Sequence, residues 1–121
     1  MSFVVDIPSV ITGVNHGYQI GYVGGHPRII KHKDVEPWQI MVARQTRLAK
    51  PSDWVPGRRV RLFIWIWFNR LGRDADGILK FLLDGVAAGL GVDDTIFLPT
   101  VVASEVDRKK PRIHLEIVSE G

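Results

Sequence analysis

The chain has 121 residues, the length of one typical domain, and its 45% of hydrophobic residues is enough for a sizeable core. Its formal net charge is +3, which weakly favours an anionic partner. It contains no cysteine, so disulfide bonds, thiolate catalysis and cysteine-ligated metals are excluded. No segment approaches the roughly 18 apolar residues of a membrane-spanning helix, and the N-terminus has no basic start, so we expect a soluble, cytoplasmic protein without a membrane partner.

The first third of the chain predicts a strand, an irregular segment and a helix. Residues 3–7 form a short apolar strand that ends at Pro8. Residues 10–33 carry five glycines and three histidines, which indicates an irregular or hairpin segment with a basic end. Asp34 is placed to cap a helix that begins near Pro37, because the missing N–H of proline suits a first helical turn.

Residues 59–68 give the clearest strand of the sequence. Apolar side chains alternate along it, so one face is entirely apolar. The other face begins with two arginines and ends in aromatic residues, which predicts that both faces are covered toward the C-terminal end of the strand. The residues of this second face are Arg59, Arg61, Phe63, Trp65 and Trp67.

The last third of the chain predicts a helix and two strands. Apolar residues recur at helical spacing over residues 76–90, and Gly89 and Gly91 supply the end of that helix. A strand follows over about residues 96–105, then a basic turn over residues 107–111 and a strand of alternating pattern from residue 112. The order of elements predicts one α+β domain over residues 1–121, with a mixed or antiparallel sheet and two main helices packed on it.

Five of the 13 acidic residues lie in the short stretch from Arg73 to Asp94. An extended entry to the predicted helix would turn Asp74 and Asp76 to the same side, because side chains two apart in extended backbone share a face. Lys80 follows one helical turn later, and Asp94 comes from a separate loop. Three carboxylates suit Mg²⁺ or Mn²⁺, and a lysine beside them offsets charge on a phosphate.

A purely structural interpretation of these residues is simpler. Asp76 then caps the helix, and Asp76, Lys80 and Asp84 form solvated pairs four residues apart. Asp93 and Asp94 are then an ordinary acidic turn.

The pattern D-x-D-x-x-x-K-x-x-x-D-G followed by D-D resembles the RusA family of Holliday junction resolvases. These are small, homodimeric, Mg²⁺-dependent endodeoxyribonucleases with the approximate pattern D-x-D-N-x-x-K-x-x-x-D and a later D-D pair. The resemblance covers the whole chain loosely, and only residues 73–94 are specific. It implies a RusA-like endonuclease domain that uses Mg²⁺ or Mn²⁺, forms a homodimer and cuts branched DNA, namely four-way junctions.

The resemblance also implies roles for individual residues. The catalytic metal ligands fall on Asp74, Asp76 and Asp94, and the catalytic lysine falls on Lys80. Asp93, Asp84 and Gly77 fall beside them as supporting positions. Gly77 departs from the family, which usually has Asn there, and this departure puts the site geometry and the activity in question. The residues that we expect to contact DNA are Arg70, Arg73, Asn15, Lys109 and Lys110.

Two other functions remain open alongside the nuclease. The first is a protein that binds junctions or other nucleic acids without cutting, which the departure at Gly77 keeps open. The second is a small basic domain that binds RNA or a protein partner. His16, His26 and His32 match no zinc motif, so we expect phosphate contact or loop packing from them. For Trp65 and Trp67, burial in a sheet or a dimer interface is favoured over stacking on bases.

Overall fold

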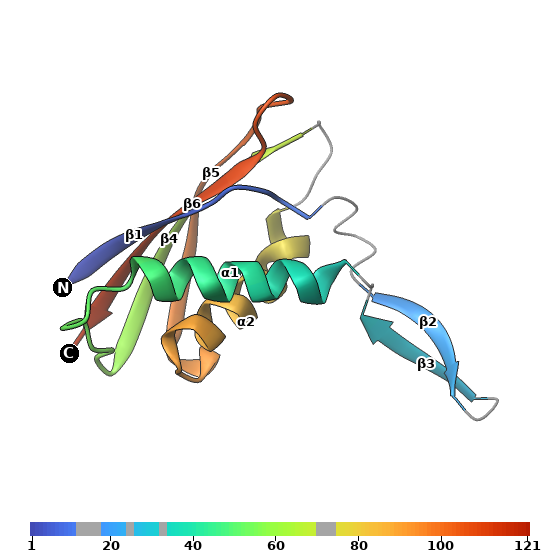
Figure 1. Ribbon diagram of the computed structural model, residues 1–121, viewed down its shortest axis with the longest axis horizontal. Helices are drawn as coiled ribbons and strands as arrows, with labels where there is room; N and C mark the ends of the chain where they lie inside the picture. The colour runs from blue at the N-terminus through green and yellow to red at the C-terminus, as the bar shows by residue number, and fades with distance from the viewer. Residues whose placement is uncertain (12–17, 24–25, 32–33, 70–74) are drawn as a thin grey trace.

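A four-stranded mixed sheet and two helices form the body of the protein, in a computed structural model that describes residues 1–11, 18–23, 26–31, 34–69 and 75–121 (Figure 1). The fold is α+β, as the sequence predicts. A separate two-stranded hairpin lies outside the four-stranded sheet. The elements in chain order are β1 (Ser2–Ile7), β2 (Tyr18–Val23), β3 (His26–Lys31), α1 (Val35–Ala49), β4 (Arg59–Phe68), α2 (Ala75–Leu90), the 3₁₀ turn η2 (Asp94–Ile96), β5 (Phe97–Val106) and β6 (Arg112–Glu120).

The strand order of the main sheet is β1-β6-β4-β5. β6 pairs antiparallel with both β1 and β4, whereas β4 and β5 are parallel and α2 makes the crossover between them. The register of β4 and β5 shifts once, because Ile64 lies opposite Val101 and Trp65 lies opposite Ala103. Val102 is therefore an extra residue, a bulge in the edge strand.

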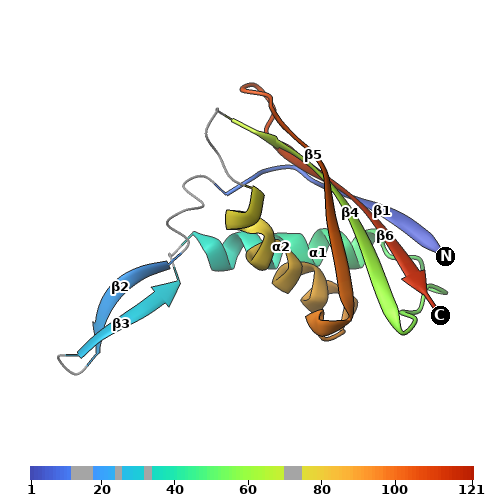
Figure 2. The ribbon, with the colours of Figure 1, turned by 180° about the vertical axis from the view of Figure 1, so that it is seen from behind.

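Both helices cover the same face of the sheet, and the core lies between them and the strands (Figure 2). Every second residue of β4 is buried on that face, and so is every second residue of β6 as far as Ile117, as the alternating sequences predict. The two helices approach closely where α2 has glycine. A Cβ on Gly89 would lie 2.6 Å from the carbonyl oxygen of Ala43, and one on Gly85 would lie 2.9 Å from the Cβ of Val42. Both contacts are too short for a side chain, so this packing requires glycine.

The opposite face of the sheet carries the aromatic residues of β4, and no helix of the described residues covers it (Figure 2). Phe63, Trp65 and Trp67 are half-buried there, so among the described residues the predicted cover of this face is partial. Their partial burial comes from neighbours in β6. The Arg112 guanidinium lies 4.1 Å from the Trp67 ring centroid, and the His114 ring lies 5.4 Å from that of Trp65.

The predicted element boundaries hold to within about two residues. α1 begins at Val35, two residues before Pro37, with Asp34 at the N-cap position. The Asp34 side chain makes no capping hydrogen bond, so the predicted role of that carboxylate in the cap is wrong. The irregular segment predicted for residues 10–33 contains the β2–β3 hairpin. None of the helices in the described part of the chain is long and apolar enough to cross a membrane.

Candidate functional site

The predicted site surrounds the beginning of α2, which follows β4 in the chain. Asp76 is the second residue of α2, near its N-terminus as predicted. Asp74 lies outside the described residues, and so the structure does not place it beside Asp76. Four further predicted residues also lie outside the described part of the chain, namely Asn15, Arg70, Arg73 and His16. His32 lies outside it too, and only the backbone of His26 is described, in β3.

Lys80 and Gly77 lie in the first two turns of α2. Lys80 is exposed, one turn after Asp76, so its ammonium group is free to approach a ligand from solvent. Gly77 is half-buried within the first turn. Glycine lowers helix stability by about 1 kcal/mol relative to alanine, so this position weakens the turn that carries Asp76.

Asp94 has two carboxylates as its neighbours. Partial loss of hydration raises its pKa, and the nearby charges of Asp84 and Asp93 raise it further. Asp93 behaves in the opposite way, because its side chain accepts a hydrogen bond of 3.0 Å from the backbone N–H of Thr95, which lowers its pKa. The structure therefore brings together Asp84, Asp93 and Asp94, and it turns Asp93 toward the backbone of η2.

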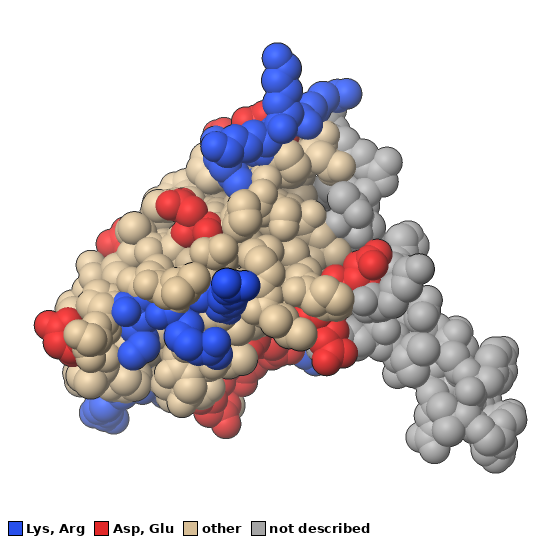
Figure 3. Space-filling model, viewed as in Figure 1, with Lys and Arg blue, Asp and Glu red and all other residues tan. Residues whose placement is uncertain are grey.

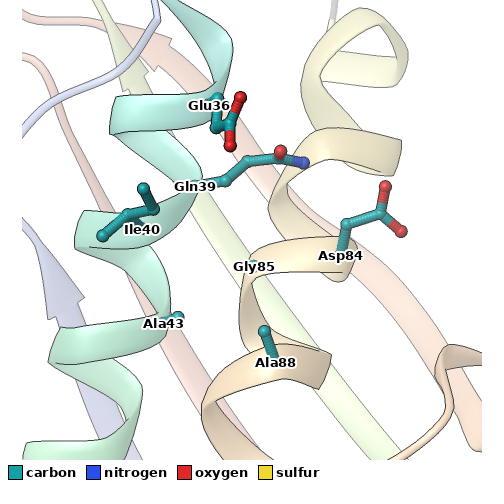
Figure 4. Close-up of a pocket in the computed structure, with 7 residues that line it drawn as sticks. All are labelled: Glu36, Gln39, Ile40, Ala43, Asp84, Gly85 and Ala88. Atoms are coloured by element: carbon teal, nitrogen blue, oxygen red, sulfur yellow. The ribbon is translucent and has the colours of Figure 1, made fainter.

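Asp84 also lines a groove between α1 and α2 (Figure 4). Glu36 contributes a second carboxylate at the same end of the groove, from the first turn of α1. Gln39 lies between them and donates from Nε2 to the carbonyl oxygen of Phe81 at 3.0 Å. Glu36 was not predicted as part of any site, since its neighbours in sequence form no motif and only the helix packing brings it near Asp84.

The predicted set of three ligands is not tested by the described residues, because Asp74 lies outside them and the side chain of Asp76 is not described. Asp84 lies eight positions after Asp76, which is about 12 Å along a helix axis. Asp94 adjoins Asp84. Within the described ranges, no three His, Cys, Asp or Glu side chains form a group that would hold a metal ion. The structure thus gives Asp84 a more central place than the supporting role that the sequence predicts.

Lys109 and Lys110 lie in the turn between β5 and β6, and both are exposed. A second basic group lies on the outer side of α1 and includes Arg44 and Arg47 (Figure 3). The two groups are on separate parts of the surface in that view, so either is available to an anionic partner independently of the other.

Comparisons with known proteins show no family for this chain. No family model matches the sequence, and no curated protein matches it. Among solved structures, a 2C-methyl-D-erythritol 2,4-cyclodiphosphate synthase from Plasmodium vivax aligns over 100% of both chains, with 9% identity and a TM-score of 0.36. A score of that size does not establish a common fold.

Proposed function

We propose that this protein is a metal-dependent, structure-selective endodeoxyribonuclease of the RusA type, which resolves four-way junctions in DNA recombination and repair in the cytoplasm. The observation that supports this best is the crowding of Asp94 by Asp84 and Asp93. None of the ion pairs among the described residues involves these three carboxylates. A nearby divalent cation would relieve the repulsion among these carboxylates. The ion needs ligands beyond the three, because within the described ranges they do not form a metal-binding group by themselves.

The donor set fits Mg²⁺ or Mn²⁺, because all its members are carboxylates. Asp74, Asp76 and Asp94 would hold one or two ions, with Asp84 beside Asp94. A bound ion would supply activation of water and stabilisation of the leaving oxygen. Lys80 is exposed one turn from Asp76, and its ammonium group would offset the charge that develops on the phosphate.

A homodimer suits this function. A four-way junction has paired strands that must be cut in equivalent positions, and two sites related by a two-fold axis provide two equivalent cuts. The DNA contacts in this proposal come from Arg70, Arg73, Asn15, Lys109 and Lys110, with the basic residues neutralising phosphates.

The second candidate is a protein that binds junctions without cutting them. Gly77 favours it, because this residue replaces the asparagine of the family pattern and weakens the first turn of α2, where Asp76 lies. In that case the carboxylates have a structural role and the basic residues carry the function.

Cleavage of a labelled synthetic four-way junction tests both candidates. The junction, a linear duplex and an RNA are incubated with the protein in Mg²⁺, in Mn²⁺ and in EDTA. The nuclease predicts paired nicks in the junction with either metal and none in EDTA. Asp74→Asn, Asp76→Asn and Asp94→Asn should each abolish cutting while junction binding survives. Asp53→Asn is the matched control, since Asp53 is exposed in the turn after α1. Binding without nicks in any metal would favour the second candidate.

A further inference from the structure

The turn between β5 and β6 is held in one conformation by a single carboxylate. Asp107 Oδ1 accepts hydrogen bonds from the backbone N–H groups of Lys109 and Lys110, both at 3.1 Å. Its Oδ2 accepts from Nη1 of Arg112 at 2.9 Å. The same Nη1 donates to the carbonyl oxygen of Lys110, also at 2.9 Å. Both ends of the turn are thus attached to one another through Asp107 and Arg112.

This arrangement leaves three cations at the tip of the turn. Arg112 and Asp107 neutralise each other, and the pairing holds the pKa of Asp107 below its usual value. Arg108, Lys109 and Lys110 are all exposed. Lys and Arg side chains project there from one end of the molecule (Figure 3). Two further acidic residues lie close to the turn among the described residues. Glu105 precedes it in the chain, and Asp6 lines a pocket together with Lys110 and Arg112.

The turn also lies beside the end of β4. The backbone N–H of Asp107 donates to the carbonyl oxygen of Phe68 at 2.8 Å, and Val106 is paired with Phe68 in the parallel register. The chain continues from Phe68 through Asn69 into the residues that precede α2. The basic turn and the segment that leads to Asp76 therefore leave the sheet at the same end, as do the carboxyl ends of any two parallel strands.

We propose that the Arg108–Lys110 turn is a preorganised contact for the DNA phosphate backbone and that Asp107 is its positioning residue. The identity of the polyanion rests on the proposed function. The tip favours a phosphate backbone over an acidic protein, because it projects from the surface and has no exposed large apolar side chain between residues 107 and 111. Protein interfaces usually have an apolar centre, whereas phosphate contacts are made by exposed cations.

The first test removes charge from the tip. Binding of a fluorescent four-way junction is measured in EDTA over a range of salt concentrations for wild type, Lys109→Ala/Lys110→Ala and Arg44→Ala/Arg47→Ala. The tip variant should bind on the order of tenfold more weakly at low salt, and its log–log salt slope should be shallower by about 0.9 for each phosphate that it no longer neutralises. The α1 variant carries the same reduction in charge and should stay close to wild type. Equally weakened binding in the two variants would show a general charge effect and overturn the proposal.

The second test separates positioning from net charge. Asp107→Ala and Asp107→Asn remove the same negative charge, so net charge alone predicts that both bind DNA more tightly than wild type. Positioning predicts that Asp107→Ala binds severalfold more weakly, because both backbone N–H groups then have no acceptor on this side chain. Asp107→Asn should recover much of the affinity, because its amide oxygen still accepts from those N–H groups. Two variants that both bind more tightly than wild type would refute a positioning role.

Folding and function are controlled separately. Melting curves show whether Asp107→Ala remains folded under the binding conditions. If Asp107→Ala unfolds, the Lys109→Ala/Lys110→Ala variant still tests the contact, because both lysines are exposed. Binding is measured without metal, so it does not depend on cleavage. If the affinities are as expected but the protein does not cut, the nuclease proposal fails and the turn remains a DNA contact. Cleavage together with unchanged affinity in the tip variant would count against the turn alone.

Discussion

Asp84, in the middle of α2, and Asp94, at the start of η2, hold their carboxylates next to each other, and the charge of Asp84 contributes to the raised pKa of Asp94. Gly91 makes this proximity possible. Its φ of 70° lets the chain reverse direction directly after α2, so the short loop that follows brings Asp94 back to the helix. The ionised form of Asp94 is therefore disfavoured in the folded protein. A proton, a cation or a neutral side chain at this position would relieve the repulsion.

Asp94→Asn should melt at a higher temperature than wild type at neutral pH in EDTA. The folded protein holds the Asp94 proton more tightly than the unfolded chain, so wild type loses stability as pH rises from 3.8 through the raised pKa. The advantage of the Asn variant should be fully present above that window and should vanish below pH 3.8. Thermal melts over a pH series measure it, and a variant that melts lower than wild type at neutral pH would contradict it.

Asp93→Asn is the matched control for this prediction. Its hydrogen bond from the Thr95 N–H lowers its pKa, so the stability it contributes is present above pH 3.8 and is lost as pH falls through the folded pKa. Asp93→Asn should therefore not melt higher than wild type at neutral pH.

Added Mg²⁺ or Mn²⁺ should raise the melting temperature of wild type more than that of Asp94→Asn, by linkage. Equal metal shifts in the two proteins would argue against Asp94 as a ligand.

Lys80→Met should slow cleavage by roughly two to four orders of magnitude, which is the range for the loss of one electrostatic stabiliser. Lys80 is exposed on α2, so the substitution should leave the fold intact and change junction affinity much less than rate. Single-turnover cleavage and binding in EDTA separate the two effects. A cleavage rate within about threefold of wild type would return Lys80 to a surface pair with its acidic neighbours on the helix.

Gly77→Asn tests the departure from the RusA pattern. Asparagine restores the usual residue and is slightly better than glycine within a helical turn, by a few tenths of a kcal/mol. We expect the variant to keep or increase cleavage, and to gain cleavage if wild type only binds. The junction assay with both proteins at equal concentration measures this. A wild type that cuts well and a Gly77→Asn protein that does not would show that the backbone needs glycine here.

Gly89→Ala should destabilise the protein by about 1–3 kcal/mol, the usual cost of overpacking a core. Alanine has the higher helix propensity by about 1 kcal/mol, but its Cβ would lie 2.6 Å from the carbonyl oxygen of Ala43. Ala88→Gly is a control on the same helix, because Ala88 is exposed and only the propensity difference applies. Urea unfolding measures both, and a Gly89→Ala protein as stable as wild type would show that α1 moves aside freely.

The sequence predicts the fold better than the site, and the reason is physical. β4 and β6 alternate strictly, and α2 repeats its apolar residues at helical spacing, so local periodicity is sufficient to locate them. The sequence predicts cover on the second face of β4 but not what provides it, because an aromatic run does not distinguish another layer of structure from side chains of a neighbouring strand such as Arg112.

The site depends on contacts between residues distant in the chain, and these have no local signal. Asp76 and Lys80 could be placed on α2 from their spacing alone. The proximity of Asp84 to Asp94 depends on how the loop after α2 reverses direction. The presence of Glu36 and Asp84 in one groove depends on how α1 packs on α2. The role of Asp107 as an acceptor within its turn likewise requires the geometry of the β5–β6 connection.

The irregularities of β5 have a consequence for how the protein associates with itself. β5 is an edge strand with exposed valines, which is the kind of strand that recruits other chains and leads to aggregates. Pro99 has no N–H to donate, and the bulge at Val102 interrupts the regular spacing of donors and acceptors. A second copy therefore finds no continuous ladder there. The protein should stay dispersed at high concentration, and the proposed homodimer should use another surface.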